Sequence, residues 1–340
     1  MIDNHFYQEP NPISVDGIVE LIGGEKHRGS GSLMVRHVAP ADQVDVGGLC
    51  FVHNKAAAAE VKDEKGVVCL VTPDLAGELG RNIAVIVTLE PKRAFGVVMK
   101  EMFPQEALEP YIHPKADIAE SAIIGDGCRI DAAVVIGENV ELGAGCHIKA
   151  GVSLGKGCVI GSNTVIDSNA SIAFAIIGES NHIGPNASIG FTGFGVGHDE
   201  GNMIIPHLGR VIMGNHNHIG ANTCIDRGFL DDTVIGNHVM CDNLVQIGHN
   251  CKVGDSNVIC GQVGISGSVT IGPNNVFGGN VGVADHVTIG SDNIFVARCG
   301  VSKSVGDRQI LAGFPAVPIQ QHRREVATLR RLAAQKKSSG

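Results

Sequence analysis

Residues 247–265 read Ile247-Gly-His-Asn-Cys-Lys-Val253-Gly-Asp-Ser-Asn-Val-Ile259-Cys-Gly-Gln-Val-Gly-Ile265, with an aliphatic residue at every sixth position. Neither the 3.6-residue period of a helix nor the two-residue period of a single strand returns every six residues. Each unit therefore reads as one short strand and one turn, which cannot bury its aliphatic residue alone. Stacked coils bury these residues in one column, so the pattern predicts a parallel β-helix.

The six-residue period covers most of the C-terminal two-thirds of the chain. Its apolar positions are Ile112, Ile118, Ile124, Ile130, Ile136, Leu142, Ile148, Leu154, Ile160, Ile166 and Ile172, then Ile177, Ile183 and Ile189, then Met213, Ile219 and Ile225, then Ile235, Cys241, Ile247, Val253, Ile259, Ile265, Ile271, Phe277, Val283, Ile289, Phe295 and Val301. Chance does not produce such long unbroken runs. We therefore predict a mainly β protein whose β-helix runs from about residue 112 to residue 301.

Two interruptions of the period predict loops that leave the β-helix. A glycine-rich stretch lies within residues 191–209, and a ten-residue spacing separates Ile225 from Ile235, which places a second loop over residues 226–234. Loops on a rigid scaffold often carry binding or catalytic residues, although they also occur as tolerated surface insertions. The sequence alone leaves both interpretations open for each loop.

The N-terminal segment, residues 1–104, lacks the period and predicts a small α/β domain. The expected elements are a helix over residues 14–21 with Ser14 as its N-cap, buried strands over residues 67–71 and 83–87, and a helix over residues 91–102 that begins at Pro91. We place the domain boundary near Pro104 and assign residues 105–316 to the β-helix domain, which Gly313 to Ala316 would close.

The C-terminal segment, residues 317–340, predicts a basic helix from Ile319 to about Lys336. Its cations are Arg323, Arg324, Arg330, Arg331, Lys336 and Lys337, opposed only by Glu325, and its apolar stripe is Val326, Leu329 and Ala333. Such a helix can dock an acidic protein by electrostatic complementarity, and its stripe can equally pack in an oligomer. The sequence leaves both roles open.

Composition and charge narrow the functional classes. The 340 residues include 46 Gly, no Trp and 4% aromatic residues, which suits a solenoid with many tight turns. A net charge of −9 and a pI near 5.9 argue against a general nucleic-acid binder. No apolar stretch approaches the length of a transmembrane segment, and the first residues do not resemble a signal peptide. We therefore expect a cytoplasmic protein.

The ten cysteines agree with a reducing compartment, where disulfides are rare. Five of them, Cys128, Cys146, Cys158, Cys251 and Cys299, each follow an apolar repeat position by four residues. Small side chains occupy that position throughout the repeat, and a free cysteine packs as a small apolar residue. We therefore predict that these five cysteines are packing residues.

The repeat resembles that of the hexapeptide-repeat acyltransferases, which implies three hexads per coil, stacking of residues 18 apart and left-handed winding. Acyl transfer needs a base that takes a proton and donors that stabilise the tetrahedral oxyanion. A histidine can be the base near neutral pH, and His249 would stack against Gly267, whose backbone N–H is exposed. On spacing alone, a surface histidine is the simpler interpretation.

The whole chain resembles the UDP-3-O-(3-hydroxyacyl)glucosamine N-acyltransferases, acyl carrier protein-dependent enzymes of lipid A assembly. The matching motifs are Ile219-Gly-Ala-Asn-Thr-Cys-Ile-Asp-Arg-Gly228, Leu230-Asp-Asp-Thr-Val-Ile-Gly236, Asp242-Asn243 through His249-Asn250, Gly193-Phe194-Gly195 and Ile204-Ile205-Pro206. The resemblance implies that His249 is the general base, that the Gly267 amide is the oxyanion donor and that His286 supports them. It places Asp242, Asn243 and Gln246 near the pantetheine and acyl path, and Gly300 where acyl-chain length is set.

The same resemblance implies substrates and assembly. The donor would be a 3-hydroxyacyl group on the 4′-phosphopantetheine arm of acyl carrier protein, with no further cofactor and no metal, and the acceptor would be the UDP-linked 3-O-acylglucosamine. The chain would form a homotrimer in the cytoplasm of a Gram-negative bacterium.

Phe51 and Asn54 match uracil-binding residues of the family. Two positions depart from the family pattern: Ala57 stands where Tyr is usual, which removes one stacking face, and Thr192 stands where Asp is usual.

Three alternatives use the same fold. O-acylation of a related nucleotide sugar is the nearest, although those relatives lack an N-terminal α/β domain. A zinc hydratase is the second, because His182, His216 and His218 are close in repeat phase, and His182 to His218 spans 36 residues, two nominal coils. A non-catalytic scaffold is the third, and the two loops and the run from Asp242 to His249 argue against it.

Overall fold

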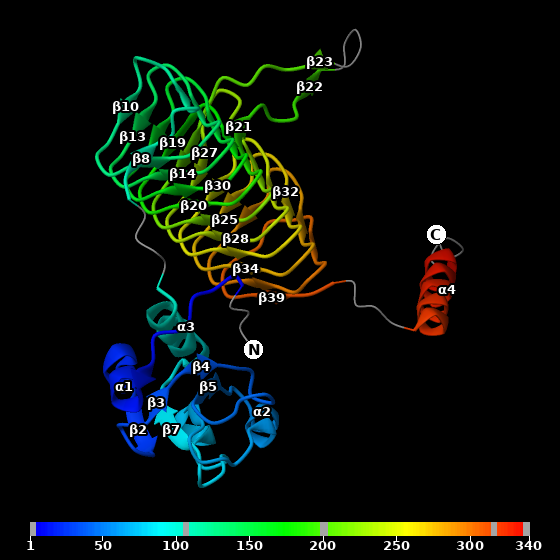
Figure 1. Ribbon diagram of the computed structural model, residues 1–340. Helices are drawn as coiled ribbons and strands as arrows, with labels where there is room; N and C mark the ends of the chain where they lie inside the picture. Colours follow the sequence, from blue (N-terminus) through cyan, green and yellow to red (C-terminus); the bar gives the residue numbers. More distant parts are fainter. Residues whose placement is uncertain (1–4, 105–108, 198–202, 314–317, 336–340) are drawn as a thin grey trace. The chain divides into compact units, whose positions relative to one another are not determined.

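The computed structural model describes residues 5–104, 109–197, 203–313 and 318–335. The chain forms two compact units, residues 1–107 and residues 108–340 (Figure 1). The first is an α/β unit, and the second contains the β-helix and the C-terminal helix. Among the described residues, no helix combines the length and the apolar character needed to cross a membrane.

A five-stranded sheet forms the centre of the first unit. Its order is β2 (Glu25–Arg28), β7 (Ala84–Val87), β6 (Val68–Val71), β5 (Gly48–Phe51) and β4 (His37–Val38), with β4 to β7 parallel and β2 antiparallel to β7. Helices α1 (Val15–Ile22) and α3 (Pro91–Met102) cover one face, while α2 (Lys55–Glu60) and the 3₁₀ turn η1 (Pro73–Leu75) cover the other. A small ladder pairs β1 (Ile13–Ser14) with β3 (Met34–Val35). The structure confirms the predicted helices and strands of this unit.

Three parallel sheets form the sides of the left-handed β-helix, as predicted (Figure 1). The nine-stranded sheet contains β10 (Ile123–Ile124), β13 (Glu141–Leu142), β16 (Val159–Ile160), β19 (Ala175–Ile177), β24 (Val211–Met213), β27 (Thr233–Ile235), β30 (Lys252–Val253), β33 (Thr270–Ile271) and β36 (Thr288–Ile289). The ten-stranded sheet contains β9 (Asp117–Ile118), β12 (Val135–Ile136), β15 (Ser153–Leu154), β18 (Ser171–Ile172), β21 (Ser188–Phe191), β26 (Cys224–Asp226), β29 (Gln246–Ile247), β32 (Gly264–Ile265), β35 (Gly282–Val283) and β38 (Gly300–Val301). The eleven-stranded sheet contains β8 (Tyr111–Ile112), β11 (Arg129–Ile130), β14 (His147–Ile148), β17 (Val165–Ile166), β20 (His182–Ile183), β25 (His218–Ile219), β28 (Met240–Cys241), β31 (Val258–Ile259), β34 (Val276–Phe277), β37 (Ile294–Phe295) and β39 (Ile310–Leu311).

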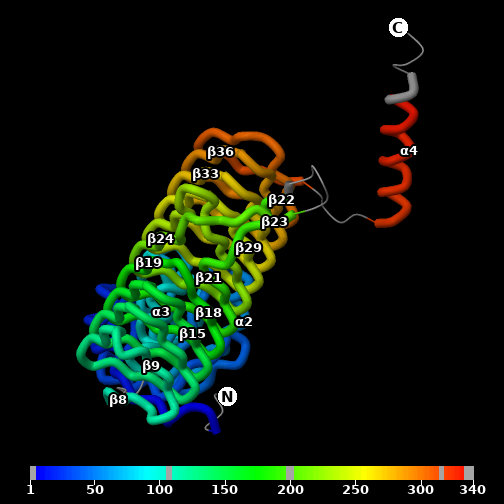
Figure 2. Tube along the Cα trace, turned by 90° about the horizontal axis from the view of Figure 1, so that it is seen from above, coloured from blue at the N-terminus to red at the C-terminus, as the bar shows by residue number. Residues whose placement is uncertain are grey.

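Neighbouring coils stack on one another and pair in parallel (Figure 2). Paired residues are 18 apart in sequence where every unit has six residues, and 17 apart across the five-residue step from Ile172 to Ile177. Gln246 pairs with Gly264, and Gly264 pairs with Gly282. The apolar repeat residues from Ile130 to Val301 point into the bore and are at most 6% exposed. This buried column is the physical cause of the six-residue period, because only one residue per short strand faces inward.

The corners of the coils depend on left-handed backbone conformations. Residues with positive φ recur at the corners, including Asn139, Asn163, Asn169, Asn186, Asn222, Asn250, Asn274, Asn280 and His286. This conformation costs an L-residue roughly 1–2 kcal/mol and is most accessible to Gly and Asn, which explains the frequency of both at the corners. The five predicted packing cysteines are buried and unpaired, and that prediction is confirmed.

A ladder of buried asparagines joins three successive coils near the C-terminal end of the β-helix. Asn275 Nδ2 donates to Asn257 Oδ1 at 3.0 Å, to Gly272 O at 2.8 Å and to Gly290 O at 3.0 Å. Asn275 Oδ1 in turn accepts from Asn293 N at 2.9 Å. Buried amides are stable only when paired, so the ladder fixes the stacking of these coils.

The first interruption is a long extruded loop, residues 191–209, that contains a hairpin of β22 (Val196–Gly197) and β23 (Met203–Ile204) (Figure 1). Because the loop leaves the coil, β20 pairs directly with β25, and His182 lies opposite His218. The 36 residues between these two histidines therefore include the extruded loop, and the two residues lie on adjacent coils.

The β-helix continues past the predicted end at residue 301. Strand β39 pairs with β37, and Val305 forms a bridge with Ile289. Residues 314–316 of the predicted closing segment lie outside the described residues. Helix α4 (Ile319–Gln335) confirms the predicted C-terminal helix, and its expected last residue, Lys336, also lies outside them.

Candidate active site

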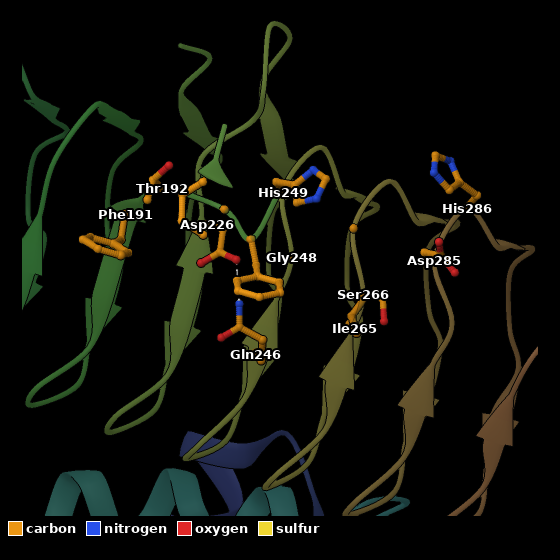
Figure 3. Close-up of a pocket in the computed structure, with 14 residues that line it drawn as sticks. Phe191, Thr192, Asp226, Gln246, Gly248, His249, Ile265, Ser266, Asp285 and His286 are labelled. Carbon is orange, nitrogen blue, oxygen red and sulfur yellow. Dashed lines mark hydrogen bonds between the residues drawn. The ribbon is translucent and has the colours of Figure 1, made fainter. Parts of the chain in front are cut away.

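His249 lies at the corner after β29, between the ten-stranded and nine-stranded sheets (Figure 3). Its Nδ1 is 3.0 Å from Asn250 Oδ1. An amide oxygen only accepts hydrogen bonds, so Nδ1 carries the proton and Nε2 keeps a free lone pair. The second loop holds Asn250 in place, because Asn250 N donates to Thr233 Oγ1 at 2.8 Å and Asn250 Oδ1 accepts from Phe229 N at 2.9 Å. The neighbouring residues thus fix the tautomer that a general base needs.

Gly267 occupies the corresponding corner of the next coil, as the pairing of Gln246 with Gly264 requires. A Cβ atom on Gly267 would lie 2.6 Å from His249 Nε2, which is closer than a Cβ atom approaches another heavy atom in a folded protein. The next amide, Ser268 N, donates to His249 O at 2.8 Å. Within the part of the chain that the structure describes, the Gly267 N–H has no protein acceptor. The predicted juxtaposition of base and bare backbone is present.

A pocket of about 710 Å³ opens beside His249 (Figure 3). The coils contribute Asp226, Gln246, His249, Gly267, Asp285 and His286, and the extruded loop contributes Phe191, Thr192, Phe194 and Ile204. A second pocket of about 440 Å³ shares His249 and His286 and adds His207, Phe229 and Leu230. His249 therefore stands where two pockets meet, and His286 lines both.

Asp226 is a pocket residue that the six-residue pattern alone does not identify. Gln246 Nε2 donates to Asp226 Oδ2 at 2.9 Å, below His249 in the close-up (Figure 3). Burial raises the pKa of Asp226 above its ordinary value, and the hydrogen bond from Gln246 and the charges of His249 and His207 oppose that rise. The available sequence signal was its place at the start of the second loop, where the coil is interrupted.

His207 is the second pocket residue that the pattern does not identify. It comes from the end of the extruded loop, is 5% exposed, and its ring centroid lies 5.0 Å from that of His249 at an interplanar angle of 70°. The only sequence signal for a role of His207 in the site was its position within the glycine-rich interruption. Periodicity does not predict which loop residue packs against the coils.

Arg227 holds both ends of the extruded loop. Its N–H donates to Phe191 O at 2.9 Å, and its Nε donates to Gly209 O at 2.6 Å. The guanidinium also stacks on Phe174, 3.5 Å from the ring centroid. Burial lowers the pKa of Arg227, which is 8% exposed. Through its backbone and its side chain, this one residue thus joins both ends of the loop that forms a wall of both pockets.

Asp242 and Asn243, predicted near the acyl path, lie at the corner before β29 and line neither pocket. Asn243 Oδ1 accepts from Ala221 N at 2.7 Å, and Asp242 Oδ2 accepts from Gly261 N at 3.0 Å. Their side chains therefore satisfy backbone donors of the adjacent coils.

Gln246 and Gly300, also predicted along this path, belong to one outward-facing row of the ten-stranded sheet. The row continues from Gln246 through Gly264 and Gly282 to Gly300, one residue per coil. A Cβ atom on any of the three glycines would meet no other atom within 4 Å. The row is consequently an open strip without side chains that begins at the pocket.

Phe51 and Asn54 lie where β5 ends, at the carboxyl edge of the parallel strands in the first unit, the edge at which open α/β sheets bind ligands. The Phe51 ring is 5.1 Å from that of Phe95. Asn54 Oδ1 accepts from Ala57 N at 2.8 Å and caps α2, while Asn54 Nδ2 is 3.0 Å from His53 Nε2. The structure thus places the two predicted residues at one edge.

The histidines of the zinc alternative do not converge. His182 Nε2 lies 2.8 Å from Asp167 Oδ2 and its ring contacts His218, whereas His216 stacks on His238. Among the described residues, no three His, Cys, Asp or Glu side chains are placed to hold a metal ion. That alternative therefore has no ligand set in the described structure.

Known proteins resemble this chain over both units. A family model described as the GMPPB C-terminal domain matches residues 110–196. UDP-3-O-acylglucosamine N-acyltransferase 2 of Legionella pneumophila (strain Philadelphia 1) is 43% identical over 99% of each chain, and UDP-3-O-acylglucosamine N-acyltransferase of Granulibacter bethesdensis is 43% identical over 97% of each. The solved UDP-N-acetylglucosamine acyltransferase of Arabidopsis is 26% identical, with a TM-score of 0.55, and the match covers 63% of this chain and 77% of that chain.

The left-handed β-helix and the similarity to acyltransferases over most of its length define the class of hexapeptide-repeat acyltransferases, and this protein is an enzyme of that class. The relatives identify the family within this class, because their similarity to this chain extends over the N-terminal unit as well as the β-helix. The chain belongs to the UDP-3-O-acylglucosamine N-acyltransferase family, which confirms the predicted family.

Proposed function

We propose that the protein transfers an (R)-3-hydroxyacyl group from acyl carrier protein to the 2-amine of UDP-3-O-(3-hydroxyacyl)glucosamine in lipid A biosynthesis. The names of relatives that are 43% identical over nearly the whole chain support this acceptor. The observation that carries the chemistry is the free Nε2 of His249 beside the bare corner of Gly267. The reaction needs no cofactor beyond the phosphopantetheine arm of the carrier.

His249 acts as the general base in this proposal. As the amine nitrogen attacks the thioester carbonyl carbon, the C–N bond forms and His249 Nε2 takes a proton from that nitrogen. The Gly267 N–H stabilises the oxyanion. When the intermediate collapses, the C–S bond breaks and the imidazolium returns the proton to the leaving thiolate. Asn250 Oδ1 accepts from Nδ1–H and stabilises the cationic ring between these two transfers.

The glycine row supports an assignment of the acyl path. Coils rise by about 4.8 Å, so the strip from Gln246 to Gly300 is about 14 Å long and accepts an extended chain without a side chain in its way. A small residue at position 300 leaves room for a long acyl group. Asp242 and Asn243 flank the start of this path at the other edge of β29 in the proposal.

We assign the uracil of the acceptor to Phe51 and Asn54. Their position at the carboxyl edge of the parallel strands supports this assignment, and an aromatic ring with an adjacent amide offers stacking and hydrogen bonding to a base. Ala57 lies in α2 and has no ring, so stacking in this proposal comes from Phe51 alone.

An apolar row on the eleven-stranded sheet supports the proposed homotrimer. Met240, Val258, Val276, Ile294 and Ile310 face outward on successive coils and are 37–76% exposed. A contiguous apolar strip of this kind marks an interface, and identical copies can bury it in a closed ring.

Helix α4 supports acyl carrier protein as the donor. Arg323, Arg324, Arg330 and Arg331 lie within it and give it a strongly basic character that complements an acidic carrier. The proposal places the reaction in the cytoplasm, which agrees with ten free cysteines.

The test is an assay of the purified protein with 3-hydroxyacyl carrier proteins of graded length and the UDP-linked 3-O-acylglucosamine. We expect an amide product, identified by mass spectrometry and by resistance to mild base. An ester product would show O-acylation instead, and no product with any donor would contradict acyl transfer. His249→Ala should lower kcat by about 10²–10⁴-fold while the protein stays folded. The control is His238→Ala, at a corner histidine stacked on His216, and this variant should have the kcat of the wild type.

A further inference from the structure

His207 carries a buried nitrogen that the proposed mechanism does not use. Its Nδ1 is 2.9 Å from Ile205 O. A carbonyl oxygen only accepts, so Nδ1 carries the proton and Nε2 has a bare lone pair. Among the described residues, Nε2 has no hydrogen-bond partner and is shielded from solvent. An unpaired buried acceptor costs folding free energy, so its presence calls for an explanation.

The ring of His207 is placed by contacts on several sides. It meets the His249 ring edge-to-face at 5.0 Å and the Phe229 ring edge-to-face at 5.5 Å. Gly193 packs against both histidines, since a Cβ there would lie 2.7 Å from His249 Cβ and 2.8 Å from His207 Nε2. His207 Nε2 and His249 Cβ therefore border the same space beside Gly193.

Ionisable side chains surround this pair of imidazoles. The Asp226 carboxylate interacts electrostatically with both imidazoles. Asp285, Asp231 and His286 line the same two pockets. If His207 became charged together with His249, two cations would lie 5.0 Å apart in a partly buried site, where their repulsion is strong.

Resting on the proposed acyl transfer, we propose that His207 is a positioning residue that holds the His249 ring and whose Nε2 lone pair stabilises the imidazolium formed during the reaction. The Nδ1–H bond to Ile205 O anchors His207 in the extruded loop. In this proposal His207 Nε2, which borders Gly193 together with the His249 side chain, is the electron-rich atom near the developing positive charge, and a fixed dipole of this kind stabilises a transition state without reorganisation. The unpaired acceptor thereby has a role that appears only when His249 is protonated.

Four variants separate this role from packing. His207→Phe keeps a ring and removes both nitrogens, and His207→Asn keeps a donor near Ile205 O but removes the acceptor at the Nε2 position. His207→Gln places an amide oxygen near that position. His182→Phe is the matched control, because His182 also meets a second histidine ring edge-to-face at 5.1 Å, on another sheet.

The expected result is a loss of kcat of roughly tenfold in the Phe and Asn variants, with KM unchanged. The acid limb of their pH profile should move to lower pH, because the imidazolium of His249 loses stabilisation. The Gln variant should recover most of the activity, and the control should match the wild type. Wild-type kcat and pH profile in His207→Phe and His207→Asn would overturn the inference. A wild-type protein without N-acyl product would instead contradict the proposed function, and thermal unfolding of each variant excludes misfolding as the cause.

Discussion

The Nε2 of His249 faces the side of Gly267 that lacks a side chain, and a Cβ there would lie only 2.6 Å from that nitrogen. The two residues are 18 apart in sequence and one coil apart in space. Their approach therefore depends on the register of β29 and β32 and on the absence of a single methyl group. The register follows from the repeat, whereas the missing methyl group is specific to Gly267.

We predict that Gly267→Ala abolishes most activity while the β-helix stays folded. The methyl group must displace the His249 ring or the backbone N–H that stabilises the oxyanion, and loss of one such donor costs about 10²–10³-fold in kcat. Steady-state kinetics check this result. Gly306→Ala is the matched control, because its Cβ would meet nothing within 4 Å. A Gly267→Ala enzyme with wild-type kcat would contradict the assignment of this corner.

The buried carboxylate of Asp226 leads us to predict that the wild type and Asp226→Asn differ in stability by an amount that depends on pH. Burial raises its pKa in the folded state above the unfolded value, so the stability it contributes is present below the unfolded pKa and is lost as pH rises through the folded pKa. At neutral pH the ionised carboxylate is therefore destabilising. Asp226→Asn, which can still accept from Gln246, should raise Tm at pH 7–8 and lower kcat, because His249 loses a nearby anion.

The measurement for Asp226→Asn is thermal unfolding at a series of pH values. The Tm difference from the wild type should shrink as the buffer is made more acidic. A lower Tm for the variant at neutral pH, or a difference that does not change with pH, would show that the carboxylate is not destabilised by burial.

The repeat made the pairing of His249 with Gly267 predictable, because every uninterrupted coil has the same length. Local signals also sufficed in the first unit, where Ser14 Oγ caps α1 by accepting from Gly17 N at 3.0 Å. Such features depend only on residues near in sequence or on a fixed period. They could therefore be predicted without coordinates.

His207 and Asp226 could not be predicted in the same way. His207 reaches the site through the extruded loop, whose path depends on tertiary contacts such as those of Arg227 with Phe191 O and Gly209 O. The same loop places His182 and His218 on adjacent coils although 36 residues separate them in sequence. Periodicity specifies where a coil is interrupted but not which loop residue returns to it.

The asparagine ladder predicts a large stability loss without an active-site effect. Asn275→Ala removes an amide that bonds Asn257, Gly272 and Gly290 and that accepts from Asn293. Buried groups left unpaired cost about 1–3 kcal/mol each. Urea unfolding should therefore show that the free energy of unfolding falls by several kcal/mol, while kcat at low temperature stays that of the wild type. Thr288→Ala, an exposed strand residue, is the control. An equal effect of both changes would show that the ladder contributes nothing specific.

The glycine row predicts a change in acyl-chain preference. Gly282→Leu places a side chain on the open strip, two coils beyond Gln246. The preferred donor should become shorter, with a loss of at least tenfold in kcat/KM for long chains, about the cost of a clash of 1–3 kcal/mol. Competition between carrier proteins of graded acyl length measures this shift. Thr288→Leu changes the nine-stranded sheet instead and should leave the preference unaltered, whereas an unaltered preference in Gly282→Leu would exclude the row as the acyl path.

The apolar row of the eleven-stranded sheet predicts the oligomeric state. Val276 lies in the middle of this row, between Val258 and Ile294. Val276→Asp would bury an unpaired carboxylate in an interface between copies, which costs several kcal/mol, so sedimentation should show the trimer dissociating to monomers. Thr270→Asp, exposed on the nine-stranded sheet, should sediment as the wild type does. A trimer that tolerates Val276→Asp would place the interface on another face, and a monomeric wild-type protein would contradict the assembly itself.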